Sequence, residues 1–110
     1  MATSNGQSAY QISFSDAVTE KLDALKSLAV QVGVRAELAA VLRTMLSQLK
    51  YTPTKWGDMQ FEYHHLNLKR FQYTGPLLVV LYAVHSARRI VFVQDVFARS
   101  GSPLDVPPET

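Results

Sequence analysis

The apolar residues of this 110-residue chain change their spacing once, close to Pro53, and that change limits the folds available to it. Before this point leucines and valines recur every three or four residues, which is typical of helices with one buried face. After it, large apolar residues alternate with polar ones, as they do in strands. Because helices and strands are grouped rather than alternating, we expect a single α+β domain.

Two helices are predicted in the first half. Ser15 can accept a hydrogen bond from the free amides that open the first helix, and Gly33 can take the left-handed conformation that ends it. The second helix is expected over residues 34–50 and stops before Pro53, because a residue that precedes proline avoids helical angles. A break of one glycine makes the two helices an antiparallel hairpin. Their buried faces are predicted to be Val18, Leu22, Leu25, Leu28, Ala29 and Val32, and then Leu38, Val41, Leu42, Met45, Leu46 and Leu49.

Strands are expected at residues 10–14 and again through most of the second half. Large residues alternate with polar ones across residues 61–73, which we interpret as one long strand broken by a bulge or turn near His64 and His65. The aromatic residues Trp56, Phe61, Tyr63, Phe71 and Tyr73 could stack on RNA bases if they faced a basic groove, but their alternation with polar residues indicates that most of them belong to the core.

Two further strands complete the predicted sheet. Residues 77–84 are almost continuously aliphatic, which indicates a central strand covered on both faces. Residues 89–97 are expected to return antiparallel to it after a short loop at residues 85–88. The expected order is therefore strand, two helices and three strands, with the helical hairpin packed on a small, mainly antiparallel sheet.

Composition limits what surrounds this domain. Hydrophobic residues make up 47% and charged residues 18% of the chain, which indicates a globular protein. We expect a single domain over residues 10–99, a disordered leader at residues 1–9 and a flexible, proline-containing tail at residues 100–110. The absence of cysteine excludes disulfides and thiolate metal sites. Because we find no secretory signal and no apolar run of about 20 residues, we expect a cytoplasmic protein without a membrane partner.

Basic residues gather in the second half of the chain. The net charge is only +2, but Asp95 is the single acid between Lys69 and Arg99. Such a bias indicates a polyanionic partner. The candidates for nucleic-acid binding are Lys69, Arg70, Arg88, Arg89 and Arg99. His85, in the expected loop, is the candidate for proton transfer, since histidine titrates near neutral pH.

The last two expected strands carry a family resemblance. Leu81-Tyr82-Ala83-Val84, a polar turn, Arg89-Ile90-Val91-Phe92-Val93 and a terminal arginine at Arg99 form a hairpin that is similar to the last hairpin of the RelE/ParE toxins. The start at Tyr10-Gln11-Ile12-Ser13-Phe14 and the segment Trp56-Gly57-Asp58 also look like that family. The resemblance covers roughly residues 10–99.

The resemblance implies a toxin component of a type II toxin–antitoxin system, among the plasmid-stabilisation-like proteins, held by a small acidic antitoxin. Some members are ribosome-dependent endoribonucleases that bind and cut mRNA without a metal or other cofactor. Arg70 and Arg99 match two of that group's basic positions, and fixed guanidinium groups stabilise charge that develops on a phosphate. By this resemblance Arg70 and Arg99 are catalytic candidates, and His85 joins them as the proton-transfer candidate named above. The resemblance implies neither a metal nor a cofactor.

Two expected groups of that site are missing. An aliphatic residue near Val79 stands where the family has a third-strand arginine, and no tyrosine follows Arg99. Three functions therefore stay open: a metal-independent mRNA endoribonuclease, a ParE-like inhibitor that acts on DNA gyrase by binding alone, and a non-toxic member that serves as an interaction module. Nothing else in the sequence indicates an enzyme, because phosphate loops and nucleophile elbows are absent.

Overall fold

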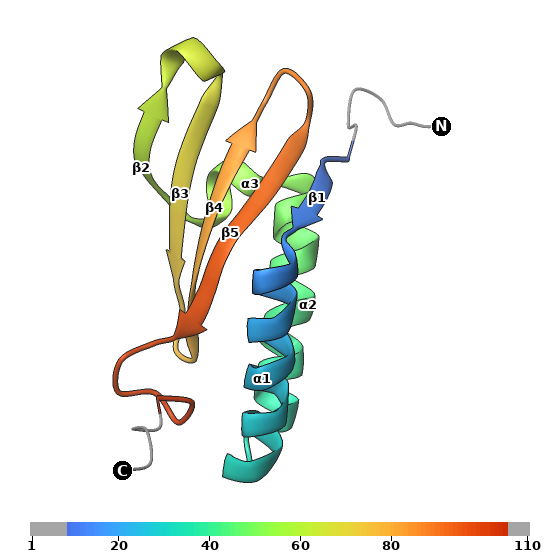
Figure 1. The fold of residues 1–110 in the computed structure, drawn as a ribbon, viewed down its shortest axis with the longest axis vertical. Helices are drawn as coiled ribbons and strands as arrows, with labels where there is room; N and C mark the ends of the chain where they lie inside the picture. Colours follow the sequence, from blue (N-terminus) through green and yellow to red (C-terminus); the bar gives the residue numbers. More distant parts are fainter. Residues whose placement is uncertain (1–8, 106–110) are drawn as a thin grey trace.

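The computed structural model describes residues 9–105 of the chain. A five-stranded sheet has the strand order β1-β5-β4-β3-β2, in which β1 runs parallel to β5 and the other neighbours are antiparallel (Figure 1). This architecture confirms the predicted α+β fold. In chain order the elements are β1 (Gln11–Phe14), α1 (Asp16–Val32), α2 (Arg35–Tyr51), α3 (Pro53–Trp56), β2 (Asp58–Tyr63), the 3-10 turn η1 (His64–Leu66), β3 (Leu68–Thr74), β4 (Leu78–His85) and β5 (Ile90–Ala98).

The helix boundaries follow the local signals in the sequence. The Ser15 side chain accepts a hydrogen bond from the Val18 amide at 3.2 Å, so it caps α1 as expected. Gly33 has φ +80° and its amide donates to the Ala29 carbonyl, so it ends α1 in the left-handed conformation. Pro53 begins the short α3, and Thr52 alone separates it from the end of α2.

The break predicted near His64 and His65 is confirmed as a turn, but the prediction of one long strand over residues 61–73 is wrong, because the chain reverses there and forms two strands. The chain reverses through η1 and Asn67, whose φ of 55° is left-handed, and β2 and β3 then pair antiparallel. Asparagine tolerates this conformation better than most residues do. Four strands, and not three, therefore follow the helices.

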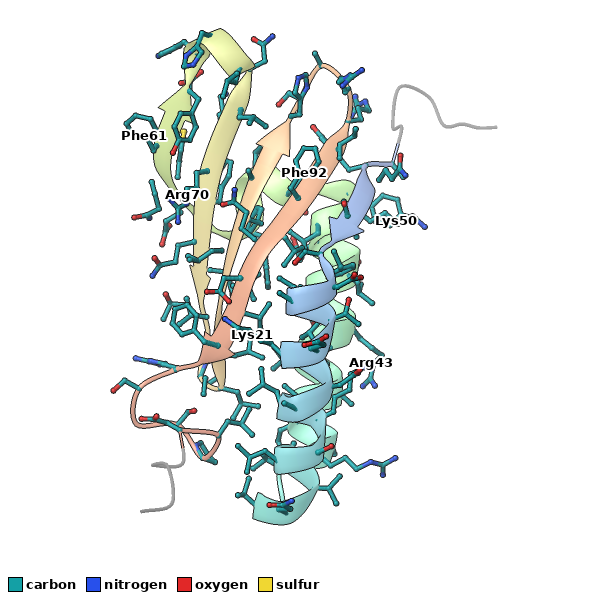
Figure 2. The ribbon with its side chains drawn as sticks, viewed as in Figure 1. Lys21, Arg43, Lys50, Phe61, Arg70 and Phe92 are labelled. Carbon is teal, nitrogen blue, oxygen red and sulfur yellow. The ribbon has the colours of Figure 1, made fainter. Side chains whose placement is uncertain are left out.

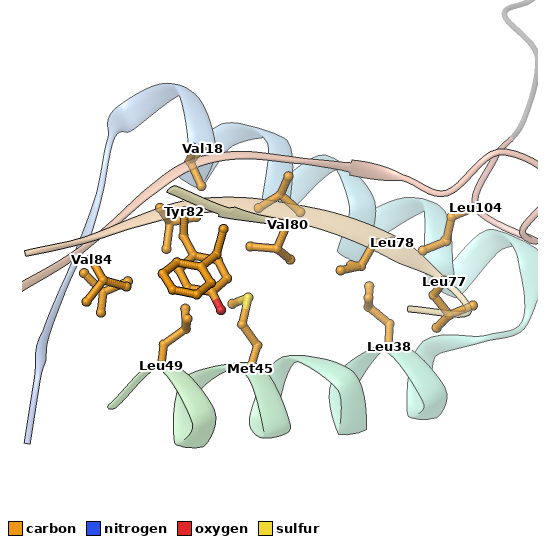
Figure 3. Close-up of a cluster of buried hydrophobic side chains, with 14 of the residues drawn as sticks. Val18, Leu38, Met45, Leu49, Leu77, Leu78, Val80, Tyr82, Val84 and Leu104 are labelled. Atoms are coloured by element: carbon orange, nitrogen blue, oxygen red, sulfur yellow. The ribbon is translucent and has the colours of Figure 1, made fainter. Parts of the chain in front are cut away.

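The helices cover the sheet unequally. Strand β4 lies at the centre of the sheet, and α2 crosses beneath it on one face (Figures 1 and 3). Helix α1 begins just after the short edge strand β1 and lies beside β5 (Figure 1). On α1, the Lys21 ammonium reaches the Asp95 carboxylate of β5 at 2.6 Å.

The core lies between α2 and the central strands (Figure 3). It contains alternate residues of β4, the predicted apolar face of α2, and residues of β5 and α1. This pattern follows because side chains alternate between the two faces of a strand and return to the same face of a helix every 3.6 residues. Its fully buried members include Leu38, Met45 and Leu49 from α2, Leu78, Val80, Tyr82 and Val84 from β4, Val91 and Val96 from β5, and Val18 and Ala29 from α1.

A buried tyrosine fastens α3 to the sheet. The Tyr82 hydroxyl donates to the Pro53 carbonyl at 2.6 Å and accepts from the Gly57 amide at 2.8 Å. A side chain at position 57 would force its surroundings to shift, because a Cβ there would lie 2.8 Å from that hydroxyl oxygen. These two bonds decide where the chain leaves α3 and enters β2.

This tyrosine makes the fold sensitive to alkali. Burial raises the pKa of Tyr82 from 10.0 to about 12, because it disfavours the phenolate. Since the folded pKa is the higher one, the stabilisation is complete below pH 10 and is lost as pH rises through about 12. We expect this loss to be on the order of 2–3 kcal/mol. Urea unfolding of wild type and Tyr82→Phe across this range tests it, and equal alkaline losses in both proteins would contradict it.

The chain after β5 is packed in its first part, although residues 100–110 are predicted to be a flexible tail. The Ser102 hydroxyl donates to the Leu77 carbonyl at 3.0 Å, and Leu104 is 2% exposed against the core. Leu104 thus anchors residues 100–105, which their proline and small residues had suggested to be flexible. Residues 106–110, like almost all of the predicted leader at residues 1–9, lie outside the described part of the chain.

Candidate functional site

One face of the sheet points away from α2, and we call it the open face. Val80 and Tyr82 of β4 point toward α2 (Figure 3). Successive strand residues point to opposite faces, so Val79, Leu81 and Ala83 belong to the open face. The register of the other strands extends this assignment across the sheet.

A row of side chains crosses the open face at Arg70, and we call it the Arg70 row. Phe61 of β2 pairs with Arg70 of β3, Arg70 with Ala83 of β4, and Ala83 with Phe92 of β5. Phe61 is 54% and Phe92 38% exposed, whereas Ala83 is buried. Figure 2 shows Phe61, Arg70 and Phe92 in the upper half of the sheet. The row therefore places one cation between two exposed aromatic rings.

The side chain of Arg70 has no ion-pair or hydrogen-bond partner among residues 9–105, although the residue is half-buried. A guanidinium group offers five donors in a fixed fork that fits carboxylate and phosphate. Its neighbour Lys69 pairs with the fully buried Val84 and therefore belongs to the opposite face. Of these two adjacent candidates, only Arg70 can act on the open face.

His85 lies on the same face as Arg70, one open-face position further along β4 than Ala83. Its Nδ1 accepts a hydrogen bond from the Arg88 amide at 3.1 Å. A neutral ring that accepts at Nδ1 carries its proton on Nε2. In this arrangement the His85 ring is suited to donate a hydrogen bond to an anion, and it would have to release Arg88 before Nδ1 could accept a proton.

The two arginines of the β4–β5 turn differ in their surroundings. Arg88 is exposed in the turn. Arg89 has a φ of 53° and lies 5.0 Å from the centre of the Tyr10 ring, and its carbonyl accepts from the Gln11 amide at 2.8 Å. Arg89 thus helps to hold β1 against the end of β5. Arg88 is the one of the pair that extends into solvent.

Arg99 lies at the other end of the sheet from Arg70. Its Nη1 donates to the Gly75 carbonyl at 3.4 Å, and its amide donates to the Leu77 carbonyl. Arg70 pairs with Ala83 of β4, and Ala83 lies six residues after Leu77, which directly precedes β4. At about 3.3 Å per residue, roughly 20 Å therefore separate the two arginines. The fold therefore does not bring together the two arginines that the resemblance assigns to one catalytic site.

Phe92 is a site residue that sequence analysis missed, whereas Phe61 is one that it considers for base stacking but groups with the core aromatics. Phe61 was grouped with Phe71 because both have odd numbers in one expected strand. The turn at η1 instead pairs Phe61 with Arg70, so that Phe61 and Phe71 point to opposite faces. The four residues from His64 to Asn67, which end in asparagine between two alternating runs, are the signal that could have indicated a hairpin.

A second surface lies along the contact between the two long helices and reaches Phe14 at the end of β1. Two adjoining hollows share Lys26 and Leu42 and follow the contact between α1 and α2. Val30 and Leu46 line them with exposed apolar side chains, and the charged residues of the lining are the cations Lys26 and Arg35. We call this surface the helix groove.

Two absences hold for the described residues. Across residues 9–105, no three histidine or acidic side chains gather in a way that could hold a metal ion. Within the same range, no helix has the length and apolar character needed to cross a membrane.

The fold defines a class: a helical hairpin on a mainly antiparallel sheet whose other face is open. A chain of the crystal structure of the toxin–antitoxin complex RelBE2 from Mycobacterium tuberculosis has this fold, with a TM-score of 0.59, 18% identity and coverage of 88% of this chain and 99% of that chain. This likeness confirms the fold expected from the resemblance to RelE/ParE toxins.

The solution structure of the conserved hypothetical protein HP0892 from Helicobacter pylori also matches, with a TM-score of 0.45, 15% identity and coverage of 83% of this chain and 96% of that chain. No protein-family model matches the sequence, and no curated protein sequence does either.

Proposed function

We propose that this chain is the toxin component of a type II toxin–antitoxin system and that it engages its target through the open face around Arg70. Two observations support the proposal together. The fold resembles that of a chain from a toxin–antitoxin complex over nearly the whole length of both chains. Arg70 presents a guanidinium group without a partner among the described residues, which suits an anionic target. The lack of a partner for the Arg70 guanidinium group is the reason why we propose Arg70 as the residue that binds the target.

Binding alone is better supported than RNA cleavage by the family's usual site. Metal-free cleavage needs several charged groups fixed around one phosphate. Roughly 20 Å along the sheet separates Arg70 from Arg99, and Arg99 is engaged with the Gly75 carbonyl. Only Arg70 and His85 then remain near one another, and His85 is arranged as a donor. These groups can hold a phosphate, but they do not form a complete acid–base pair.

The helix groove is the surface that suits an antitoxin. Its apolar lining at Val30 and Leu46 fits one face of an amphipathic helix, and Lys26 and Arg35 at its rim favour acidic residues on that helix. A small acidic protein encoded beside this chain is the expected partner. An antitoxin helix bound in the helix groove would leave the open face uncovered. Release of the antitoxin therefore need not break any contact with Arg70.

Induction of this chain in a growing bacterial culture is expected to arrest growth, because a free toxin acts once no partner covers it. The measurement is optical density and colony count after tightly controlled induction, beside co-expression of the acidic neighbour, which should restore growth. Continued growth with soluble, folded protein would overturn the proposal and leave a non-toxic interaction module.

Two further assays separate the targets. Incorporation of labelled amino acids falls at once if mRNA on the ribosome is the target. Supercoiling by purified gyrase falls in the presence of purified protein if gyrase is the target. The second result alone would assign the ParE-like mode of action.

A further inference from the structure

We infer that two copies of this chain associate through strand β2, whose edges pair antiparallel so that Phe61 of one copy lies opposite Phe61 of the other. The assembly is a two-fold dimer in which the two sheets form one continuous sheet. The inference concerns the edge of the sheet and goes beyond the proposed function, which concerns its open face.

Strand β2 has one unpaired side. It is the last strand in the order of the sheet, and β3 is its only strand neighbour in the part of the chain that the structure describes. Figure 1 shows no helix or strand beyond β2 at that edge. The other edge differs, because β1 has only four residues and the Tyr10 amide just before it donates to the Lys50 carbonyl of α2. Backbone amides and carbonyls on the outer side of β2 are therefore available to another strand.

The side chains of β2 do not protect this edge. Natural sheets commonly block an exposed edge with lysine or proline, and the six residues of β2 include neither. Met59 is 55% and Phe61 54% exposed, and Figure 2 shows Phe61 at the outer edge. Met59 pairs with Phe71 and Phe61 with Arg70, so the two exposed side chains lie on opposite faces. Apolar surface is thus exposed on both faces of the edge, where a second strand would cover it.

A bulge shifts this edge without ending it. Gln60 is the extra residue between Met59 and Phe61, and its side-chain amide donates to the Asp58 carbonyl at 3.1 Å. Residues 61–63 then pair in regular order with β3. With Gln60 left out of the count, side chains alternate between the two faces along the whole strand.

Two copies of β2 can pair with matching faces in a register that opposes no like charges. With Phe61 at the two-fold axis, Glu62 lies opposite Met59 of the second copy, and both belong to the helix side of the sheet. Tyr63 lies opposite Asp58 of the second copy, and both belong to the open face. The central pair is aromatic, which favours cross-strand association. A register centred on Glu62 would instead place two carboxylates opposite each other, which is destabilising.

Charge favours a second copy over an acidic partner at this edge. Strand β2 carries Asp58 and Glu62 and no base, so a strand from an acidic antitoxin would add like charge. Self-pairing avoids this conflict, because each acid lies opposite an uncharged residue of the other copy. Within its own chain, Glu62 also lies opposite Lys69 of β3.

The dimer joins the two open faces into one surface. Arg70 lies opposite Phe61 on β3, so β2 and its second copy are the strands between the two Arg70 residues. At about 4.8 Å between neighbouring strands, roughly 14 Å separate the two guanidinium-bearing positions. One anionic target would then meet two equivalent cations related by the two-fold axis.

Sedimentation velocity at increasing protein concentration tests the association. The interface is small, so we expect a Kd on the order of 10 μM. Phe61→Lys places two ammonium groups opposite each other at the axis and is expected to weaken association about tenfold or more. Phe97→Lys is the matched control, because Phe97 is 42% exposed on the same face but belongs to β5, away from the β2 edge. It should associate like wild type, and circular dichroism confirms that both variants are folded.

Cysteine cross-linking tests the register. The chain contains no cysteine, so Phe61→Cys introduces a single thiol, opposite its own copy at the axis. Directly opposite residues of antiparallel strands have Cα atoms about 4.5–5.5 Å apart, a distance that a disulfide spans. Mild oxidation should convert most of the Phe61→Cys variant to a covalent dimer on a non-reducing gel. Phe97→Cys should stay mostly monomeric.

The inference fails if the wild-type chain sediments as a monomer at every concentration. Association that survives Phe61→Lys, or that Phe97→Lys weakens equally, would belong to a different surface and also refute it. Equal cross-linking of the two cysteine variants would show random collision rather than the proposed register. A monomer that arrests growth on induction would refute the dimer and still support the toxin proposal, whereas a dimer without growth arrest would do the reverse.

Discussion

Replacing Arg70 with alanine is expected to abolish growth arrest, whereas replacing its neighbour Lys69 is expected to leave arrest intact. The two side chains carry the same charge but point to opposite faces of β3. On the proposed function Arg70 binds an anionic group of the target. A charge-assisted contact of this kind contributes about 1.5–3 kcal/mol, so its loss is expected to lower target affinity roughly ten- to a hundredfold. Colony counts after induction, at matched protein levels, measure the difference. Equal arrest by both variants would remove Arg70 from the site.

Stability measurements keep this comparison interpretable. Because Arg70 has no partner among residues 9–105, we expect Arg70→Ala to change the free energy of unfolding by no more than about 0.5 kcal/mol. Arg99→Ala serves as a third variant, since Arg99 lies at the other end of the sheet. Loss of arrest in Arg99→Ala with an unchanged melting temperature would indicate a target that spans both ends.

Replacing Tyr82 with phenylalanine is expected to lower the free energy of unfolding by about 2–3 kcal/mol near neutral pH. The change keeps the ring but removes both hydrogen bonds of the hydroxyl, so the Pro53 carbonyl and the Gly57 amide lose their partner. Tyr51→Phe is the matched control, because Tyr51 is 54% exposed. It should differ from wild type by no more than about 0.5 kcal/mol in urea unfolding.

A double-mutant cycle with Gly57→Ala tests the cause of this effect. The new Cβ would lie 2.8 Å from the Tyr82 hydroxyl oxygen and 3.0 Å from the Gln72 carbonyl oxygen. Such overpacking costs about 1–3 kcal/mol. Removing the hydroxyl relieves the first contact, so the double variant should lose less stability than the sum of the two single variants. Strict additivity would show that Tyr82 and Gly57 do not act through this contact.

The type and order of most elements could be predicted from the sequence because their signals are local. Ser15 and Gly33 bound α1 through hydrogen bonds and a backbone conformation that involve only nearby residues. The continuous aliphatic run of β4 indicates burial on both sides wherever that strand lies, and β4 proved to be the central strand. Because the helices and the strands are each grouped along the chain, the α+β class could also be predicted from the sequence.

The composition of the candidate site could be predicted only in part. Arg70 and His85 were recognised from their chemistry, and the fold puts both on the open face. Arg99 was recognised in the same way, yet the fold holds it at the opposite end. A pattern of basic residues along a chain carries no distance between them, since that distance depends on strand pairing.

The apolar spacing of the sequence by itself determined the helical hairpin, the antiparallel strands and the α+β class, because periodicity and capping act within a few residues. Only the tertiary structure decided which side chains share a face. The turn at η1 pairs Phe61 with Arg70, an odd position with an even one, and so turns Phe61 away from Phe71 and onto the open face. Register is a relation between strands, and a single turn residue more or less would exchange the two faces of β2.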